Sequence, residues 1–215
     1  MATAPDTSQR GTPKQARGIA ARNALLDATA EILAEATQIE VSLSEISRRS
    51  KINSAMIKYY FGDKQGLLMA LLERDAELAM SSLNALVAMD ISAEKKMTIH
   101  VEGMVNAYYR APYLNRLLHY IVEAGGSEAS ARMSRLFIHP MMNAYRSIIR
   151  QGVAEGSMAE IEPGMLYYAL VGSADHPFYA NYSAPAVLGT EAIDVETKNG
   201  YATFLRQIFI KGLRP

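Results

Sequence analysis

The side chains best suited to bind a partner lie in residues 54–61, SAMIKYYF. Lys58 can donate hydrogen bonds to O6 and N7 of guanine, and Ser54 can hydrogen-bond to either kind of base. Ala55 and Met56 can pack against the methyl group of thymine, and Tyr59 is left on the same side. The segment therefore predicts a helix that reads bases in the major groove of DNA. The alternatives are that Lys58 is a solvated charge and that the tyrosines only pack within their domain.

Capping residues define the elements that must position this segment. Ser42 and Glu45 form a capping box, which predicts a helix from Ser42 to about Ser50. Asn53 is an N-cap candidate for a helix over 54–61, and Asp63 is one for a long helix that begins at Lys64. Because only about three residues separate the first two helices, they must cross steeply, as in a helix-turn-helix.

This window resembles the tetracycline-repressor (TetR) family of bacterial regulators, most specifically in YYFGDK, residues 59–64. Eleven residues fall on the family pattern in register: Ser42, Leu43, Ile46, Ser47, Ile52, Asn53, Ile57, Tyr60, Phe61, Lys64 and Leu67. The resemblance implies that Tyr60 and Lys64 contact phosphate. Lys64 also lies in the first turn of its helix, where its ammonium adds to the positive helix end.

Ser42 can likewise contact phosphate at the start of its own helix. Ser44 is also predicted to be a DNA-binding residue. The chain departs from the family pattern at three positions. Lys51 and Thr37 stand where glycines are usual, and Lys58 stands where a tyrosine is usual. Lys51 must therefore adopt a turn conformation that suits glycine better, and Lys58 is expected to change which bases are read. Arg48 and Arg49 are either solvated or in contact with phosphate.

The composition is that of an ordinary globular protein whose charge is unevenly distributed. The 215 residues have zero net charge and no cysteine, which excludes disulfides, thiolate metal sites and a cysteine nucleophile. Residues 41–64 carry five basic and two acidic residues, and residues 1–22 carry four basic residues and one acidic residue. Positive charge is thus concentrated near the motif, as DNA binding requires. No apolar run predicts a membrane span or a signal peptide, so a cytoplasmic protein is expected.

The patterning predicts an all-α protein of about nine helices. We expect a disordered basic arm over 1–18, a three-helix helix-turn-helix domain over 19–65, and an effector-binding and dimerisation domain over 66–215. The first helix is predicted over 18–36, and a long helix with Leu78 among its buried residues over 64–89. Five more helices are predicted over 92–110, 113–124, 128–154, 163–182 and 196–212. Pro140 should kink or break the third of these, and residues 183–191 read as a loop.

The C-terminal part contains tyrosines, histidines and methionines that could line an apolar cavity with polar groups. The candidate effector-binding residues are Tyr109, His119, Met142, Tyr145, Tyr168 and His176. A core that merely contains tyrosines would give the same pattern, so both interpretations stay open. His119 and Glu123, four residues apart, supply too few ligands to predict a metal site. We expect neither a metal nor a cofactor.

Apolar stripes at helical spacing mark the last two helices. They comprise Tyr167, Leu170, Val171 and Ala174 on the first helix, and Phe204, Leu205, Ile208 and Phe209 on the second. Such stripes can be plain core. In the tetracycline-repressor family these two helices pair with their copies in a second subunit, so the resemblance implies a homodimer.

Taken together, the residues and the resemblance predict a ligand-responsive transcription repressor. It would bind a palindromic operator on double-stranded DNA as a homodimer and be released by a small-molecule effector. The alternative is a helical module that binds a small molecule or a protein and has lost sequence-specific DNA binding. No nucleophile elbow, phosphate-binding loop or zinc-protease motif is present, so an enzyme is not expected.

Overall fold

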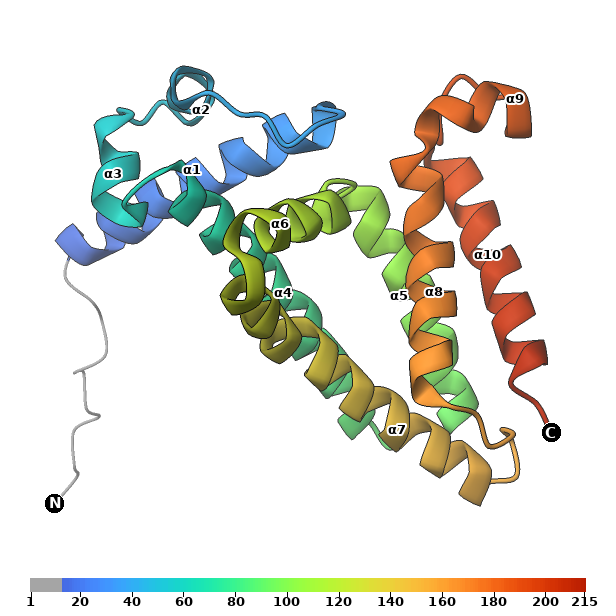
Figure 1. The fold of residues 1–215 in the computed structure, drawn as a ribbon. Helices are drawn as coiled ribbons and strands as arrows, with labels where there is room; N and C mark the ends of the chain where they lie inside the picture. The colour runs from blue at the N-terminus through green and yellow to red at the C-terminus, as the bar shows by residue number, and fades with distance from the viewer. Residues whose placement is uncertain (1–12) are drawn as a thin grey trace, which may run out of the picture.

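The computed structural model describes residues 13–215, which are helical with short connections (Figure 1). The predicted all-α fold is confirmed. The N-terminal head consists of α1 (Pro13–Glu35), α2 (Leu43–Ser50) and α3 (Ala55–Phe61), followed by the long helix α4 (Lys64–Ala88). Helix α1 begins earlier than expected, so residues 13–18 of the predicted arm are helical. The rest of that arm lies outside the described residues.

The body contains α5 (Ala93–Arg110), α6 (Leu114–Met133), α7 (His139–Ala154), α8 (Pro163–Tyr179), the short α9 (Ala184–Leu188) and α10 (Val195–Gly212). Figure 1 shows α4 running from the head into the body beside α7, with α5, α8 and α10 on the other side of the body. Helix α6 lies between the head and the body. No helix among the described residues is both long enough and apolar enough to cross a membrane.

The head is held together by a small apolar core. Leu25, Leu26 and Leu33 of α1 are fully buried. They belong to the same cluster as Ile46 of α2 and Ile57 of α3. This packing follows from the 3.6-residue period of α1 and fixes the orientation of the two short helices, which could not be stable alone.

Several boundaries in the body differ from those predicted. Gly126 has φ 58° and ψ −142°, a conformation open to glycine, so it kinks α6 without ending the helical run. A π-helical turn over 134–138 precedes α7, whose second residue is Pro140. Proline cannot donate to the preceding turn, and the backbone hydrogen-bond pattern changes there from π-helical to α-helical. The predicted loop 183–191 instead contains α9, and Leu78, predicted to be buried, is exposed.

Helix α8 passes through Pro177 without ending. Proline has no N–H, so the carbonyl of Ser173, four residues earlier, loses its helical partner. The hydroxyl of Tyr201 on α10 donates to that carbonyl at 2.6 Å. The proline therefore creates an acceptor that ties α8 to α10.

Candidate nucleic-acid interface and effector cavity

The turn between α2 and α3 is built by a lysine in a left-handed conformation. Lys51 has φ 58° and ψ 22°, as its place in the motif requires. Ser47 Oγ donates to the carbonyl of Ile52 at 2.7 Å, and the N–H of Ile52 donates to Ser50 Oγ at 3.2 Å. The short connection is thus closed by side chains of α2, which fixes the angle between the two helices.

Two side-chain caps and a turn at Asn53 fix where the helices begin. The N-cap of α3 is Ser54, which makes no side-chain cap bond, so the predicted N-cap Asn53 lies one residue before it. Ser42 accepts from the N–H of Glu45 at 3.1 Å, and Asp63 accepts from the N–H of Gly66 at 2.7 Å. Asn53 Oδ1 accepts from the N–H of Ala55 at 2.8 Å. A Cβ atom at Gly66 would lie 2.0 Å from the carbonyl oxygen of Phe61, so only glycine fits this turn into α4.

Helix α3 presents part of the predicted base-reading face to solvent. Ala55, Lys58 and Tyr59 are exposed, and the Tyr59 ring is 77% accessible. Lys58 has no ion-pair partner in the described part of the chain. Ser54 and Met56 are half-buried, and Met56 packs against the core, so Met56 offers less surface than predicted.

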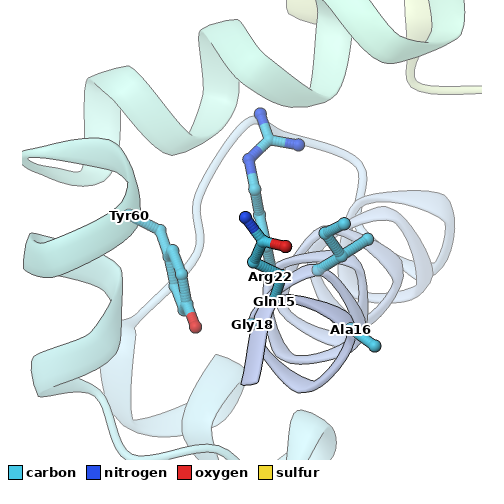
Figure 2. A pocket seen from close by; sticks show the side chains of 6 residues that line it. Gln15, Ala16, Gly18, Arg22 and Tyr60 are labelled. Carbon is cyan, nitrogen blue, oxygen red and sulfur yellow. The ribbon is translucent and has the colours of Figure 1, made fainter. Parts of the chain in front are cut away.

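Tyr60 faces a groove between α3 and the start of α1 (Figure 2). Its ring is half-buried and packs edge-on against Tyr59, with 5.0 Å between the ring centroids. The groove is also lined by Gly18 and by Arg22, whose guanidinium lies 5.2 Å from the centroid of the Phe61 ring. A phenol and a guanidinium beside this groove are groups that suit a phosphate.

The two arginines of α2 are engaged within the head. Arg49 donates to Glu35 at 2.6 and 2.7 Å and to Glu45 at 3.3 Å, and Arg48 donates to Glu45 at 2.6 and 3.0 Å. Hydrogen bonds from Arg49 and Arg48 lower the pKa values of the Glu35 and Glu45 carboxyls, respectively. Arg49 braces α2 against Glu35 of α1, whereas Arg48 pairs within α2. Among the side chains that the structure describes in the head, the positive charge that forms no ion pair comes from exposed Arg17, Lys51 and Lys58. Half-buried Arg22 and Lys64 add to it.

The candidate effector residues do not form one cluster. Tyr145 is fully buried, and its hydroxyl lies 2.9 Å from Nε2 of His100 and 3.6 Å from the sulfur of Met104. Burial lowers the pKa of His100 to about 4, so its ring is neutral at pH 7. His100 is not among the predicted residues, although its spacing from Met97 and Met104 places it on the buried stripe of α5.

The other candidates lie nearer the surface. Tyr109 packs edge-on against Phe178, and Met142 is half-buried. Tyr168 is 76% exposed and His176 is exposed, so the structure does not place either in the wall of an enclosed cavity in this subunit. Tyr168 and His176 lie on the outer face of α8, because Leu170 and Ala174 occupy its inner face.

The apolar stripes of α8 and α10 are divided between core and surface. Leu170, Ala174 and Leu205 are buried inside the subunit, which corrects their assignment to a dimer interface. Helix α5 covers them, since both α8 and α10 pack on it. Tyr167, Val171 and Phe209 are half-buried. Met165, Tyr168, Phe204 and Ile208 are 73, 76, 55 and 50% exposed, respectively, and we call these four residues the outer apolar stripe.

A polar cavity of about 490 Å³ lies at the junction of head and body. We call it the junction cavity. It is lined by Thr37 after α1, several residues of α6 including His119, and two residues of α8. Asp175 Oδ1 is buried there without a hydrogen-bond partner, and burial raises the pKa of the Asp175 carboxyl.

Polar contacts connect α6 and the body to the head. Arg74 of α4 donates to Asp27 of α1 at 2.6 Å and to Asp75 at 3.3 Å. Asp75 also accepts from the hydroxyl of buried Tyr113 at 2.7 Å, just before α6. Burial and the neighbouring Asp75 raise the pKa of Tyr113, so its proton stays in this bond.

A helix-turn-helix head on an all-helical body is the architecture of a one-component transcription regulator. Residues 90–214 match the family described as "Tetracyclin repressor-like, C-terminal domain". The chain belongs to this family.

Individual relatives agree with this assignment. The chain is 36% identical over 85 residues to the HTH-type transcriptional regulator BetI of Escherichia coli, covering 38% of this chain and 43% of BetI. It is 22% identical over 196 residues to the HTH-type transcriptional repressor NicS of Pseudomonas putida, covering 90% of this chain and 92% of NicS. The fold is similar to that of FadR from Bacillus subtilis in complex with stearoyl-CoA. That comparison has a TM-score of 0.65 and 12% identity, and covers 91% of this chain and 99% of the other.

Proposed function

We propose that this protein is a ligand-responsive transcription repressor that binds a palindromic operator as a homodimer. The observation that carries the proposal is the exposed face of α3. Lys58 and Tyr59 stand outward on a helix that Ile57 and the capped turns hold in a fixed orientation. Residues 13–65 would form the DNA-binding head and residues 66–215 the effector-binding and dimerisation body, acting in the cytoplasm, where bacterial DNA is.

The outer apolar stripe supports the dimer. Met165, Tyr168, Phe204 and Ile208 form a surface on α8 and α10 that is too apolar for solvent. A second copy related by a two-fold axis would cover it with the same residues. The two α3 helices would then meet half-sites separated by about 34–36 Å or a multiple of the helical turn.

Regulation requires a ligand that distinguishes two arrangements of the head. The FadR structure contains stearoyl-CoA, which is a finding about that protein. For the present chain we infer a small-molecule effector in the body that favours an arrangement in which the two α3 helices no longer match the operator. Such a ligand shifts the equilibrium only as far as its affinity differs between the two states.

The test is selection of operator DNA followed by measurement with variants. The purified protein is mixed with fragments of its source genome, the retained DNA is sequenced, and affinity for the recovered palindrome is measured by fluorescence anisotropy. Lys58→Ala should weaken binding by about 5- to 150-fold, because one base contact contributes about 1–3 kcal/mol. Lys95→Ala is the matched control, since Lys95 is an exposed lysine at the far end of the body. Unchanged binding by Lys58→Ala would show that α3 does not read the bases.

The same experiment separates the alternative of a binding module that no longer reads DNA. Such a protein would retain fragments that share no sequence at low salt and release them at physiological salt. The named relatives are transcriptional regulators, which does not favour this alternative.

A further inference from the structure

The lining of the junction cavity contains two carboxylates and one arginine. Asp175 of α8 and Glu123 of α6 both line it, and neither has an ion-pair partner among the described residues. Asp175 Oδ1 is buried and accepts no hydrogen bond. Burial raises the pKa of this carboxyl, although a hydrogen bond with Asn115 and the nearby Arg116 lower it. A buried acceptor without a donor is costly, so this oxygen is a binding group that lacks its partner.

The arginine in the same wall is already engaged elsewhere. Arg116 donates through Nη2 to the carbonyls of Leu33 and Ala36 at 3.3 and 3.0 Å, and through Nη1 to the carbonyl of Thr37 at 3.2 Å. These carbonyls end α1, where the helix dipole favours a cation. The terminal N–H groups of Arg116 are therefore used by the head, although its charge still lowers the pKa of Asp175. Only its buried Nε–H has no partner.

The charged groups that line the cavity indicate which class of ligand can bind there. An anion would approach two carboxylates and meet an arginine whose terminal N–H groups are already used. A metal ion is not favoured either, because the described residues contain no group of three or more His, Cys, Asp or Glu placed to hold one. A protonated amine supplies both the missing donor and the missing positive charge.

We propose that the junction cavity is a binding site for a small organic cation with N–H donors, such as a primary amine or a guanidine. Its N–H groups donate to Asp175 Oδ1, and Glu123 balances its charge at the open side of the cavity. The rings of Tyr120 and Tyr179, which also line the cavity, are placed to contact the carbon chain or the cation. The volume of about 490 Å³ lies within the usual range for small-molecule sites.

The site is connected to the DNA-binding head through its own walls. Arg116 holds the end of α1 by donating to the carbonyl of Thr37. The Tyr120 hydroxyl accepts a hydrogen bond from Gln65 Nε2, at the start of α4, at 2.9 Å. A ligand that contacts these side chains changes the bonds that position the head on α6. The regulatory part of this inference rests on the proposed function as a DNA-binding repressor, whereas the binding site itself does not.

Binding is measured first, without DNA, by isothermal titration calorimetry of the full chain with agmatine, putrescine and spermidine. Tetramethylammonium, which has no N–H, and succinate, which is an anion, are the matched ligand controls. We expect at least one amine to bind once per subunit, and neither control to bind. Binding of succinate in preference to all three amines, or no binding of any amine, would overturn the proposal.

Variants then locate the site. Asp175→Asn should weaken amine binding by about 10- to 100-fold, because a charge-assisted hydrogen bond is lost. Glu123→Gln lies on the exposed side, is expected to fold normally, and should weaken binding by a smaller factor. Glu128→Gln removes an exposed carboxylate of α6 outside the cavity and should change nothing. Equal affinities for the wild type and both cavity variants would mean that the amine binds elsewhere.

A second measurement tests the coupling to the head. Operator affinity is determined with and without a saturating amine in the wild type and in Glu123→Gln. We expect the amine to change operator affinity in the wild type, with a weaker effect at the same concentration in the variant. Amine binding with unchanged operator affinity would refute the coupling, whereas failure of the unliganded protein to bind any operator would refute the proposed function instead.

Discussion

Replacing Lys51 with glycine should stabilise the protein. Among the described residues, Lys51 is the only residue other than glycine with positive φ, at 58°. The left-handed conformation brings Cβ close to the following carbonyl oxygen and costs roughly 1–2 kcal/mol for a residue with a Cβ. Glycine removes this cost but loses more freedom on folding, which offsets about 0.5–1 kcal/mol. The net expectation for Lys51→Gly is a gain of about 0.5–1 kcal/mol.

The assay is thermal or chemical unfolding at a fixed protein concentration. For a chain of this size, about 1 kcal/mol corresponds to a rise of roughly 2–4 °C in the melting temperature. Lys51→Ala is the matched control, because alanine also removes the positive charge but keeps the Cβ atom. The alanine variant should not be stabilised. Equal stabilisation by alanine and glycine would show that relief of charge repulsion, and not backbone strain, causes the effect. Destabilisation by glycine would refute the left-handed conformation itself.

Three further predictions concern the interface, the buried histidine and the turn into α4. Ile208→Arg places a charge on the outer apolar stripe and should shift the dimer to monomers in light scattering, whereas Lys211→Arg should not. Burial depresses the pKa of His100 to about 4, so the unfolded state binds more protons as the pH falls below about 6.5. Unfolding by urea should therefore show a loss of about 2 kcal/mol between pH 7 and pH 5, and a smaller loss in His100→Gln. Gly66→Ala should lower stability by more than about 1 kcal/mol in the same assay, since its Cβ overlaps the Phe61 carbonyl.

The head could be predicted in detail because its boundaries are set by local interactions. Ser42 and Asp63 each cap a helix by accepting from an N–H three residues ahead, and such bonds depend only on nearby sequence. The caps need no knowledge of the rest of the chain. The left-handed turn at Lys51 instead follows from the resemblance to a family in which a glycine is usual at that position.

The division of the body between core and surface could not be predicted in the same way. Helical spacing shows that a stripe is apolar, but not which element covers it. Leu170 and Leu205 are buried because α5 packs against both helices, whereas Tyr168 and Phe204 on neighbouring faces remain exposed. The junction cavity joins residues of α6 and α8 to Thr37, which are distant in sequence, so no local pattern indicates it.

The contacts between α6 and the head are of a kind that a small ligand can alter. Helix α1 and the first half of α4 share an apolar core, so they are expected to move together as one unit. They contact α6 and the segment before it through apolar side chains of the same cluster. Hydrogen bonds of Arg116, Tyr120 and Tyr113 add to these contacts. A net hydrogen bond contributes only about 0.5–1.5 kcal/mol, so exchanging a few of them costs a few kcal/mol. A ligand that binds one arrangement about 100-fold more tightly supplies about 2.7 kcal/mol. The hydrogen bonds at the junction are therefore the contacts through which a ligand in the cavity can change the orientation of the head.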